Sequence, residues 1–235
     1  MLNAIAGNDT LQSTLAIVAE EFPLALFETL YVTVLSTLFA IVIGLPLGIL
    51  LVAGEKDGVL PLPKALLSVL NILINILRSI PFLILMIMVI PLTRLLIGTS
   101  VGTVASIVPL VIAAFPFVAR LVESSLREVD PNLIETARSM GATPMQIIWK
   151  VMLPESVPSL LGNFTIAITT ILGYSAMSGI IGGGGLGKIA INYGYYRYMY
   201  LVMILAVILL VVLVQVFQST GTKLANSCDK RLKNR

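Results

Sequence analysis

Four long stretches of the chain carry no charged residue, and they limit its fold more than any other feature. The stretches run from Thr29 to Gly54, Leu95 to Ala119, Ser156 to Gly187 and Tyr198 to Thr222. The hydrocarbon core of a bilayer is about 30 Å thick, and roughly 20 residues of helix cross it. Because 57% of its 235 residues are hydrophobic and only 11% are charged, we expect an all-α, polytopic membrane protein.

A fifth apolar region lies between Lys64 and Arg94, but Arg78 interrupts it. Neither half alone reaches the roughly 20 residues of a span, so we predict one tilted helix at about 68–93 that Pro81 kinks. Arg78 would then lie inside the membrane, where a charge is costly unless it is paired or reaches the interface. Extension of its side chain to the near interface is favoured over a functional role, and both readings stay open.

Five transmembrane helices place the two ends of the chain on opposite sides of the membrane. The predicted spans are about 29–53, 68–93, 99–119, 157–181 and 198–219. Lys and Arg in the connecting segments number eleven on one side and three on the other, with Arg78 left out. Because basic loops stay in the cytoplasm, we expect an extracytoplasmic N-terminal segment (1–27) and a basic cytoplasmic tail (223–235). Residues 28–222 would form one transmembrane domain, with a cytoplasmic loop at 120–155.

The residue types exclude several classes of function. The chain has no His and a single Cys, Cys228, which argues against His-ligated metals, cysteine clusters, Ser-His or Cys-His catalysis and an intrachain disulfide. The net charge of +3 fits membrane topology better than nucleic-acid binding, because the basic residues are scattered between apolar runs. Residues 1–27 contain no Lys or Arg, so they lack the basic start of a signal peptide. We therefore expect no enzymatic activity in this chain.

The loop at 120–155 begins with clear signals for a short helix. Asp130 followed by Pro131 is the pattern of an N-cap and a proline at the first helical position. Gly141 offers a left-handed stop. These signals predict a helix over 131–140.

A second short helix is predicted directly afterwards. Thr143 before Pro144 repeats the start signal, and the helix can run to about Met152, before Leu153 and Pro154. Apolar residues recur at helical spacing on both helices, namely Leu133, Ala137 and Met140 on the first and Met145, Ile148, Trp149 and Met152 on the second. The spacing alone favours equally packing on the chain's own helices and docking into a groove of a soluble partner.

The loop resembles a known motif. Glu135-Thr136-Ala137, three residues, Gly141, nine residues, Val151, one residue and Leu153-Pro154 is similar to the EAA loop of permease subunits of ATP-binding-cassette importers, with departures at Thr136 and Val151. The resemblance implies a coupling helix seated in a cleft of a cytoplasmic ATPase. Glu135 and Gly141 would form its elbow, and local backbone donors would orient the Glu135 carboxylate. The residues expected to couple to the ATPase are Glu135, Ala137, Arg138, Met140, Gly141, Ala142, Pro144, Leu153 and Pro154.

A closer resemblance covers the chain from about Glu28 to the end of the fifth span. The runs Arg78–Phe82, Gly141–Ile147 and Gly173–Met177 look like the methionine-uptake branch of these permeases. The resemblance implies a type I importer in the bacterial inner membrane. It would consist of a homodimer of this permease, two ATPase subunits that bind ATP and magnesium, and an extracytoplasmic, often lipid-anchored binding protein. No cofactor is expected on this chain.

The glycine run Gly182–Lys188 nearly matches the sequence pattern of a phosphate-binding loop. We reject that function because Ile189 stands where a Ser or Thr would bind magnesium, and no soluble strand precedes the run. The run instead permits backbone that departs from helix where it is packed in protein or lines a cavity. Candidate residues for a pathway or gate, weighed evenly against plain packing, are Tyr174, Ser175, Met177 and Ser178.

Other features give weaker indications. Gly44 and Gly48 form a small-xxx-small face suited to close helix packing. Five tyrosines are interpreted as an aromatic belt at the outer membrane–water interface. They are Tyr193, Tyr195, Tyr196, Tyr198 and Tyr200.

An ion-coupled secondary transporter is disfavoured because the carboxylates nearest the hydrocarbon, Glu28 and Glu155, lie at span boundaries. A scaffold subunit is disfavoured because it would not need a loop that couples to an ATPase. Import of another amino acid or of a short peptide is the alternative to methionine.

Overall fold

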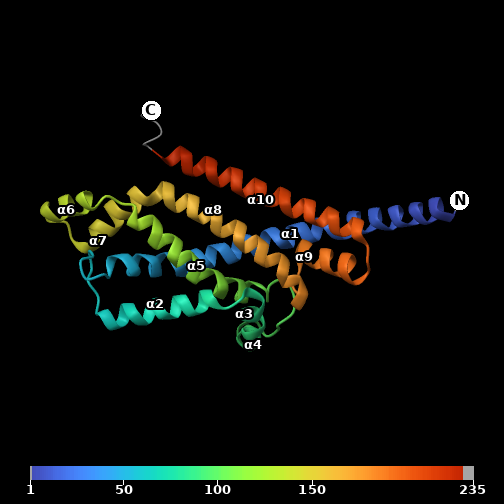
Figure 1. Cartoon of the computed structure of the whole chain (residues 1–235), viewed down its shortest axis with the longest axis horizontal. Helices are drawn as coiled ribbons and strands as arrows, with labels where there is room; N and C mark the ends of the chain where they lie inside the picture. The colour runs from blue at the N-terminus through green and yellow to red at the C-terminus, as the bar shows by residue number, and fades with distance from the viewer. Residues whose placement is uncertain (1, 230–235) are drawn as a thin grey trace. The chain divides into compact units, whose positions relative to one another are not determined.

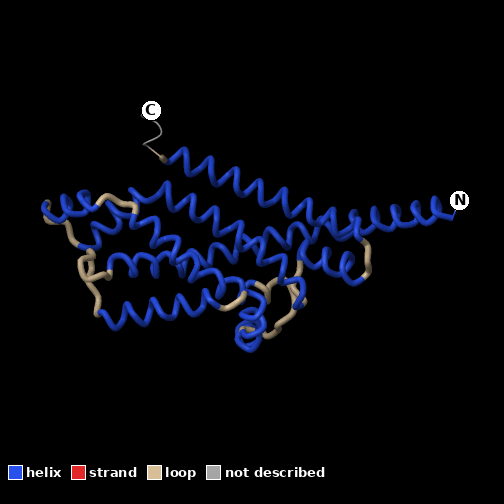
Figure 2. Tube along the Cα trace, in the orientation of Figure 1, coloured by secondary structure: helices blue, strands red, loops and turns tan. Residues whose placement is uncertain are grey.

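The computed structural model describes residues 2–229, with side chains from residue 12 onward. Their regular structure is entirely helical, and short loops join the helices (Figure 2). Four helical segments within this part of the chain are long and apolar enough to cross a membrane, and a broken pair raises the number to five. The prediction of an all-α protein with four clear spans and one interrupted span is therefore confirmed.

The helices follow one another along the chain as labelled in Figure 1. They are α1 (Leu2–Ala53), α2 (Lys64–Ser79), α3 (Phe82–Met88), α4 (Ile90–Ile97), α5 (Ile107–Arg127), α6 (Pro131–Ser139), α7 (Pro144–Ile147), α8 (Leu153–Ser178), α9 (Gly185–Ile189) and α10 (Tyr200–Cys228). Two π-helical segments, Ile148–Met152 and Ala190–Tyr196, and the 3-10 turn Gly179–Ile181 complete them.

The chain divides into two compact units. Unit 1 comprises Met1–Ser36, Phe82–Leu110 and Thr170–Val216. Unit 2 comprises Thr37–Pro81, Val111–Thr169 and Phe217–Arg235. The division falls inside α1, α8 and α10, and the contacts described below lie within one unit or the other.

The prediction of one kinked helix over 68–93 is wrong. Helix α2 ends at Ser79, Ile80 is extended with a ψ of 126°, and α3 begins at Phe82. A proline has no N–H to donate and pushes the preceding residue out of the helical region, so Pro81 breaks the span. Arg78 lies exposed in the last turn of α2, a favourable place for a cation.

The third span lies further along the chain than the predicted 99–119. Helix α5 begins at Ile107 and continues to Arg127, past Ala119. Gly98 and Gly102 have φ values of 85° and 107°, which interrupt a helix, so the segment before Ile107 forms turns. The first residues of the cytoplasmic loop predicted at 120–155 are therefore helical.

The remaining helices are also longer than predicted. Helix α1 is continuous from Leu2, so residues before 28 do not form a separate element. Helix α10 continues beyond the predicted end at 219 to Cys228 and includes the start of the tail at 223–235, of which residues 230–235 lie outside the described part.

The helix that begins at Pro144 does not stop before Leu153 and Pro154. It continues through the π-helical segment into α8, and a single apolar segment runs from Pro144 to Ile181. A π turn adds a residue to the helical register. Here it ends two residues before Pro154, which cannot donate a backbone hydrogen bond.

Close packing within unit 2 joins α1 to α5. A Cβ atom on Gly44 would lie 2.8 Å from Val118 Cγ1, and one on Gly48 would lie 2.7 Å from the Ala119 carbonyl oxygen. Both glycines therefore let the two backbones approach, as a small-xxx-small face requires. Beside them Leu51, Ile74 and Ala119 form a buried apolar cluster of α1, α2 and α5.

Candidate functional site

Helix α6 is capped by its own segment of the chain. The Asp130 carboxylate accepts a hydrogen bond of 2.9 Å from the Asn132 N–H, and Met140 ends the helix. Gly141 has a φ of 80°, and a Cβ there would meet no atom within 4 Å. The predicted helix over 131–140 and its glycine stop are confirmed. A larger residue at 141 would be disfavoured by its backbone conformation and not by a clash.

Helix α7 begins with a capping box. The Gln146 N–H donates to Thr143 Oγ1 at 3.4 Å, and the Thr143 N–H donates to Gln146 Oε1 at 2.9 Å. This reciprocal pair satisfies two backbone donors that the first turn leaves without partners. The start signal predicted at Thr143-Pro144 is confirmed.

The apolar stripes of the two helices divide between inside and outside. Ile148 and Met152 are buried, so this part packs on the chain's own helices. Met140, Met145 and Trp149 are instead 82%, 58% and 60% exposed. Trp149 donates its ring N–H to Met145 Sδ at 3.2 Å, which holds these two side chains together. Packing on the chain's own helices therefore accounts for one part of the loop, and the other part stays exposed and available for docking.

The other coupling candidates lie on or near the same segment. The Arg138 guanidinium donates to the Gly58 carbonyl oxygen at 2.5 Å, which ties α6 to the loop between α1 and α2. Glu135 is exposed and lines a hollow of about 570 Å³ with Asp57. Asp130, not Glu135, receives the backbone hydrogen bond at the start of α6. The remaining coupling candidates are exposed or half-buried, namely Ala137, Ala142, Pro144, Leu153 and Pro154. The last two of them belong to α8.

The four pathway candidates on α8 do not share one face. Ser175 and Ser178 are buried and donate to carbonyl oxygens of their own helix, at Leu172 and Ser175. Met177 is 44% exposed, and the Tyr174 ring stacks on Phe82 with centroids 4.3 Å apart. Of the four, only Tyr174 and Met177 have side chains that are not buried.

The glycine run departs from helix as predicted. A 3-10 turn, Gly179–Ile181, follows α8, and Gly182 and Gly185 have φ values of 86° and 82°. The Gly185 N–H at the start of α9 donates to Glu28 Oε2 at 2.7 Å. The position that would hold a phosphate in a nucleotide site therefore holds the chain's own carboxylate.

Glu28 and Thr29 form a clamp on α9 that sequence reasoning missed. Thr103 donates to Glu28 Oε1 at 2.7 Å, and Thr29 Oγ1 accepts from the Leu186 N–H at 2.9 Å. Glu28 lies 157 residues from its partner Gly185. The sequence did show Glu28 and Thr29 at the edge of an apolar span. This pattern gave no indication of which residues they contact.

The tyrosine cluster follows α9. The Tyr193 hydroxyl donates a hydrogen bond to the Glu21 carboxylate, and this bond raises the pKa of Tyr193 because it stabilises the protonated phenol. The Arg197 guanidinium lies 4.7 Å from the Tyr193 ring centre. Exposed neighbours, as an interfacial belt requires, are Tyr195, Tyr196, Tyr198 and Tyr200.

Comparisons with known proteins agree with this architecture. The family model for the inner membrane component of binding-protein-dependent transport systems matches residues 44–220. The probable D-methionine transport system permease protein MetI of Vibrio cholerae is 48% identical over 88% of this chain and 92% of that protein. The D-methionine transport system permease protein MetI of Escherichia coli is 49% identical over 65% of this chain and 70% of that protein.

Solved structures show the same fold. An inward-facing structure of the MetNI methionine ABC transporter matches with a TM-score of 0.86 and 46% identity, covering 88% of this chain and 95% of that one. An amino acid ABC transporter, at 21% identity and a TM-score of 0.66, shares the fold alone.

The helices, the glycine-stopped loop and these matches define a multi-pass permease of the cytoplasmic membrane with the transmembrane fold of a type I ABC importer. This chain belongs to the family of inner membrane components of binding-protein-dependent transport systems.

Proposed function

We propose that this chain is the permease subunit that carries methionine across the bacterial inner membrane in an ATP-driven importer. The names of its relatives, at up to 49% identity, supply the substrate class. The observation that carries the mechanism is an exposed apolar surface formed by Met140 at the end of α6, Met145 on α7 and Trp149 in the π-helical segment that follows. A rigid loop with such a surface is suited to dock in a groove of a soluble ATPase.

The assembly that we propose has two copies of this chain, two ATPase subunits and an extracytoplasmic binding protein. Five helices per chain are few to wall a pathway, which favours a dimer around it. ATP and magnesium act on the ATPase subunits, and this chain carries out no chemistry. The predominance of Lys and Arg in the segments on the side of α6 supports a cytoplasmic loop and an N-terminus outside.

Tyr174 and Met177 are the residues that we propose to meet the substrate. A polarizable thioether and an aromatic ring suit an apolar amino acid that passes without a fixed charged pocket. Met177→Trp should block uptake while the binding protein still stimulates ATP hydrolysis. The matched control is Ser175→Ala, because Ser175 is buried and bonded within its own helix; equal loss of uptake in both variants would contradict this assignment.

Uptake of labelled methionine into proteoliposomes tests the function directly. The vesicles hold this chain, its ATPase and the cognate binding protein, with ATP inside and competing apolar amino acids outside. We expect saturable, ATP-dependent uptake that only methionine-like compounds reduce. ATPase stimulation without methionine uptake would preserve an importer and reject methionine as its substrate, in favour of another amino acid or a short peptide.

A further inference from the structure

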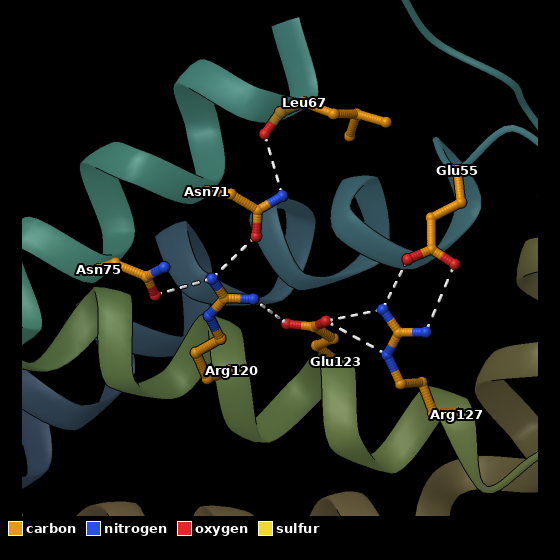
Figure 3. A network of polar contacts seen from close by, with 7 residues as sticks. All are labelled: Glu55, Leu67, Asn71, Asn75, Arg120, Glu123 and Arg127. Atoms are coloured by element: carbon orange, nitrogen blue, oxygen red, sulfur yellow. Dashed lines mark hydrogen bonds and ion pairs between the residues drawn. The ribbon is translucent and has the colours of Figure 1, made fainter. Parts of the chain in front are cut away.

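Unit 2 contains a ladder of alternating charges that links the loop after α1 to α5 and α2 (Figure 3). The Arg127 guanidinium bridges Glu55 Oε1 at 2.7 Å and Glu123 Oε1 at 2.9 Å. The other oxygen of Glu123 lies 2.6 Å from Arg120 Nη1. Glu55 follows the end of α1, and the other three residues lie on one face of α5 at spacings of three and four residues. The two pairs balance, so the ladder needs no external ion.

The ladder ends on two amides of α2. Arg120 Nη2 donates to Asn71 Oδ1 at 2.8 Å and to Asn75 Oδ1 at 2.9 Å. The Asn71 amide nitrogen donates to the Leu67 carbonyl oxygen at 3.0 Å, which turns the side-chain oxygen toward Arg120. Asn71 and Asn75 are one helical turn apart, so a single guanidinium holds both.

The inner part of the ladder is shielded from solvent. The side chains of Arg120 and Glu123 are 21% and 13% exposed, whereas those of Arg127 and Glu55 are 47% and 48% exposed. Hydrogen bonds to charged groups are roughly twice as strong as neutral ones and are strengthened further by a low local dielectric. The Arg120–Glu123 pair, from which the bonds to α2 extend, is therefore the firmest part of the ladder, whereas Asn75 itself is exposed.

Helix α6 is joined to the other end of the ladder. Arg138 on α6 binds the Gly58 carbonyl oxygen, and the Gly58 N–H donates to the Glu55 carbonyl oxygen at 2.9 Å. Contacts therefore run without interruption from α6 through the loop after α1 to α5 and on to α2. Helix α2 leads directly to the break at Pro81, where the first of the three chain stretches of unit 2 ends.

We infer that the ladder Glu55–Arg127–Glu123–Arg120–Asn71/Asn75 is a strut that moves α2 together with α6. The inference rests on the proposed function, since it assumes that an ATPase displaces α6. In this assignment the ladder residues are positioning residues for transport and touch no substrate. The competing explanation is that the same charges only anchor helix ends at the membrane surface.

The double substitution Asn71→Leu and Asn75→Leu separates these explanations. It removes the α2 end of the ladder, leaves all four charges paired and makes an apolar helix more apolar, so the permease should still insert. The measurement is methionine imported per ATP hydrolysed in proteoliposomes. Loss of two hydrogen bonds to a charged group should lower this ratio roughly tenfold. An anchoring role would lower the amount of complex and leave the ratio unchanged.

Two further substitutions complete the comparison. Ser68→Leu makes the same kind of change at an exposed position of α2 outside the ladder and should leave the ratio at the wild-type value. Arg120→Leu should lower the ratio at least as much as the asparagine pair does, because it also removes the bond to Glu123. Adding the asparagine pair to Arg120→Leu should lower the ratio no further, because both asparagines act through Arg120. Additive losses would overturn the inference.

A distance measurement tests the strut without relying on transport. Spin labels at Ser139→Cys on α6 and Ile76→Cys on α2, both exposed, are placed in a Cys228→Ser background within the whole complex. We expect the same label distance without nucleotide and with a non-hydrolysable ATP analogue, and a changed distance in the asparagine-pair variant. A nucleotide-dependent distance in the intact ladder would overturn the inference. If instead the wild-type complex neither imports substrate nor responds to the binding protein, the proposed function fails.

Discussion

Two regions of this permease contain the same elements, a glycine with positive φ beside short helices, but they are stabilised in different ways. Around Gly141, the caps of α6 and α7 come from Asp130, Thr143 and Gln146, all within a few residues of the helix ends that they serve. Around Gly185, the cap of α9 comes from Glu28, 157 residues away. The first region holds its own shape and exposes apolar side chains, whereas the second takes its shape from distant contacts and is buried. A locally encoded element suits docking to a partner, and a clamped one suits fixing helices to each other.

The strongest test of this difference is Gly185→Val. Gly185 has a φ of 82°, and a Cβ there would lie 2.5 Å from Thr29 Oγ1. A left-handed conformation costs an L-residue about 1 to 2 kcal/mol, and overpacking adds about 1 to 3 kcal/mol. We expect a large fall in the midpoint of thermal unfolding in detergent. Gly162→Ala, in a helix with nothing within 4 Å, should not lower it; a fall of equal size there would remove the contrast.

The clamp itself is tested by Glu28→Leu. The Gly185 N–H and the Thr103 hydroxyl would lose their acceptor, at a cost of about 1 to 3 kcal/mol for each buried group left unpaired. Thermal unfolding should therefore occur at a lower temperature. Glu28→Gln keeps an oxygen for the Gly185 N–H and should recover most of the stability. If Gln is as damaging as Leu, the negative charge matters and the hydrogen bonds do not.

Gly141→Leu should uncouple the exposed region without unfolding the protein. The site is open, so only the strain of a φ of 80° acts, about 1 to 2 kcal/mol. Because 1.4 kcal/mol corresponds to a factor of ten, the methionine moved per ATP hydrolysed should fall roughly tenfold while insertion is normal. Gly141→Asn should be milder, since Asn tolerates this conformation. Normal transport in the leucine variant would refute the coupling role of this loop.

The smallest effect is expected for Thr143→Ala. It removes one half of the capping box and should cost about 1 kcal/mol, confined to the start of α7. The midpoint of global unfolding should barely move, whereas hydrogen exchange of the Gln146 amide should accelerate. Thr143→Ser retains the hydroxyl and should exchange as the wild type does. A large fall in global stability would show that this region also depends on distant contacts.

The sequence was most informative where signals are short in range. Asp130-Pro131, Gly141 and Thr143-Pro144 located both ends of the first loop helix and the start of the second, because caps and stops act over three or four positions. Span ends were less accurate. Charges at 120, 123 and 127 suggested that a span had ended, but their mutual pairing lets α5 continue to Arg127.

Long-range partners were invisible to the same reasoning. Arg120, Glu123 and Arg127 at helical spacing, together with two asparagines four positions apart in apolar α2, were a signal that the sequence did contain. The sequence did not indicate that the charged residues of α5 contact the asparagines of α2. The same holds for Glu28, which was read only as a carboxylate at a span boundary.

The sequence by itself determined that this protein crosses a membrane by helices and carries one glycine-stopped loop, since hydrophobic length and local capping depend only on neighbouring residues. The tertiary structure decided which polar groups pair, that Pro81 breaks a span instead of kinking it, and which apolar residues of the loop stay exposed. Such choices depend on contacts between residues far apart in the chain. Those contacts exist only once the helices have packed.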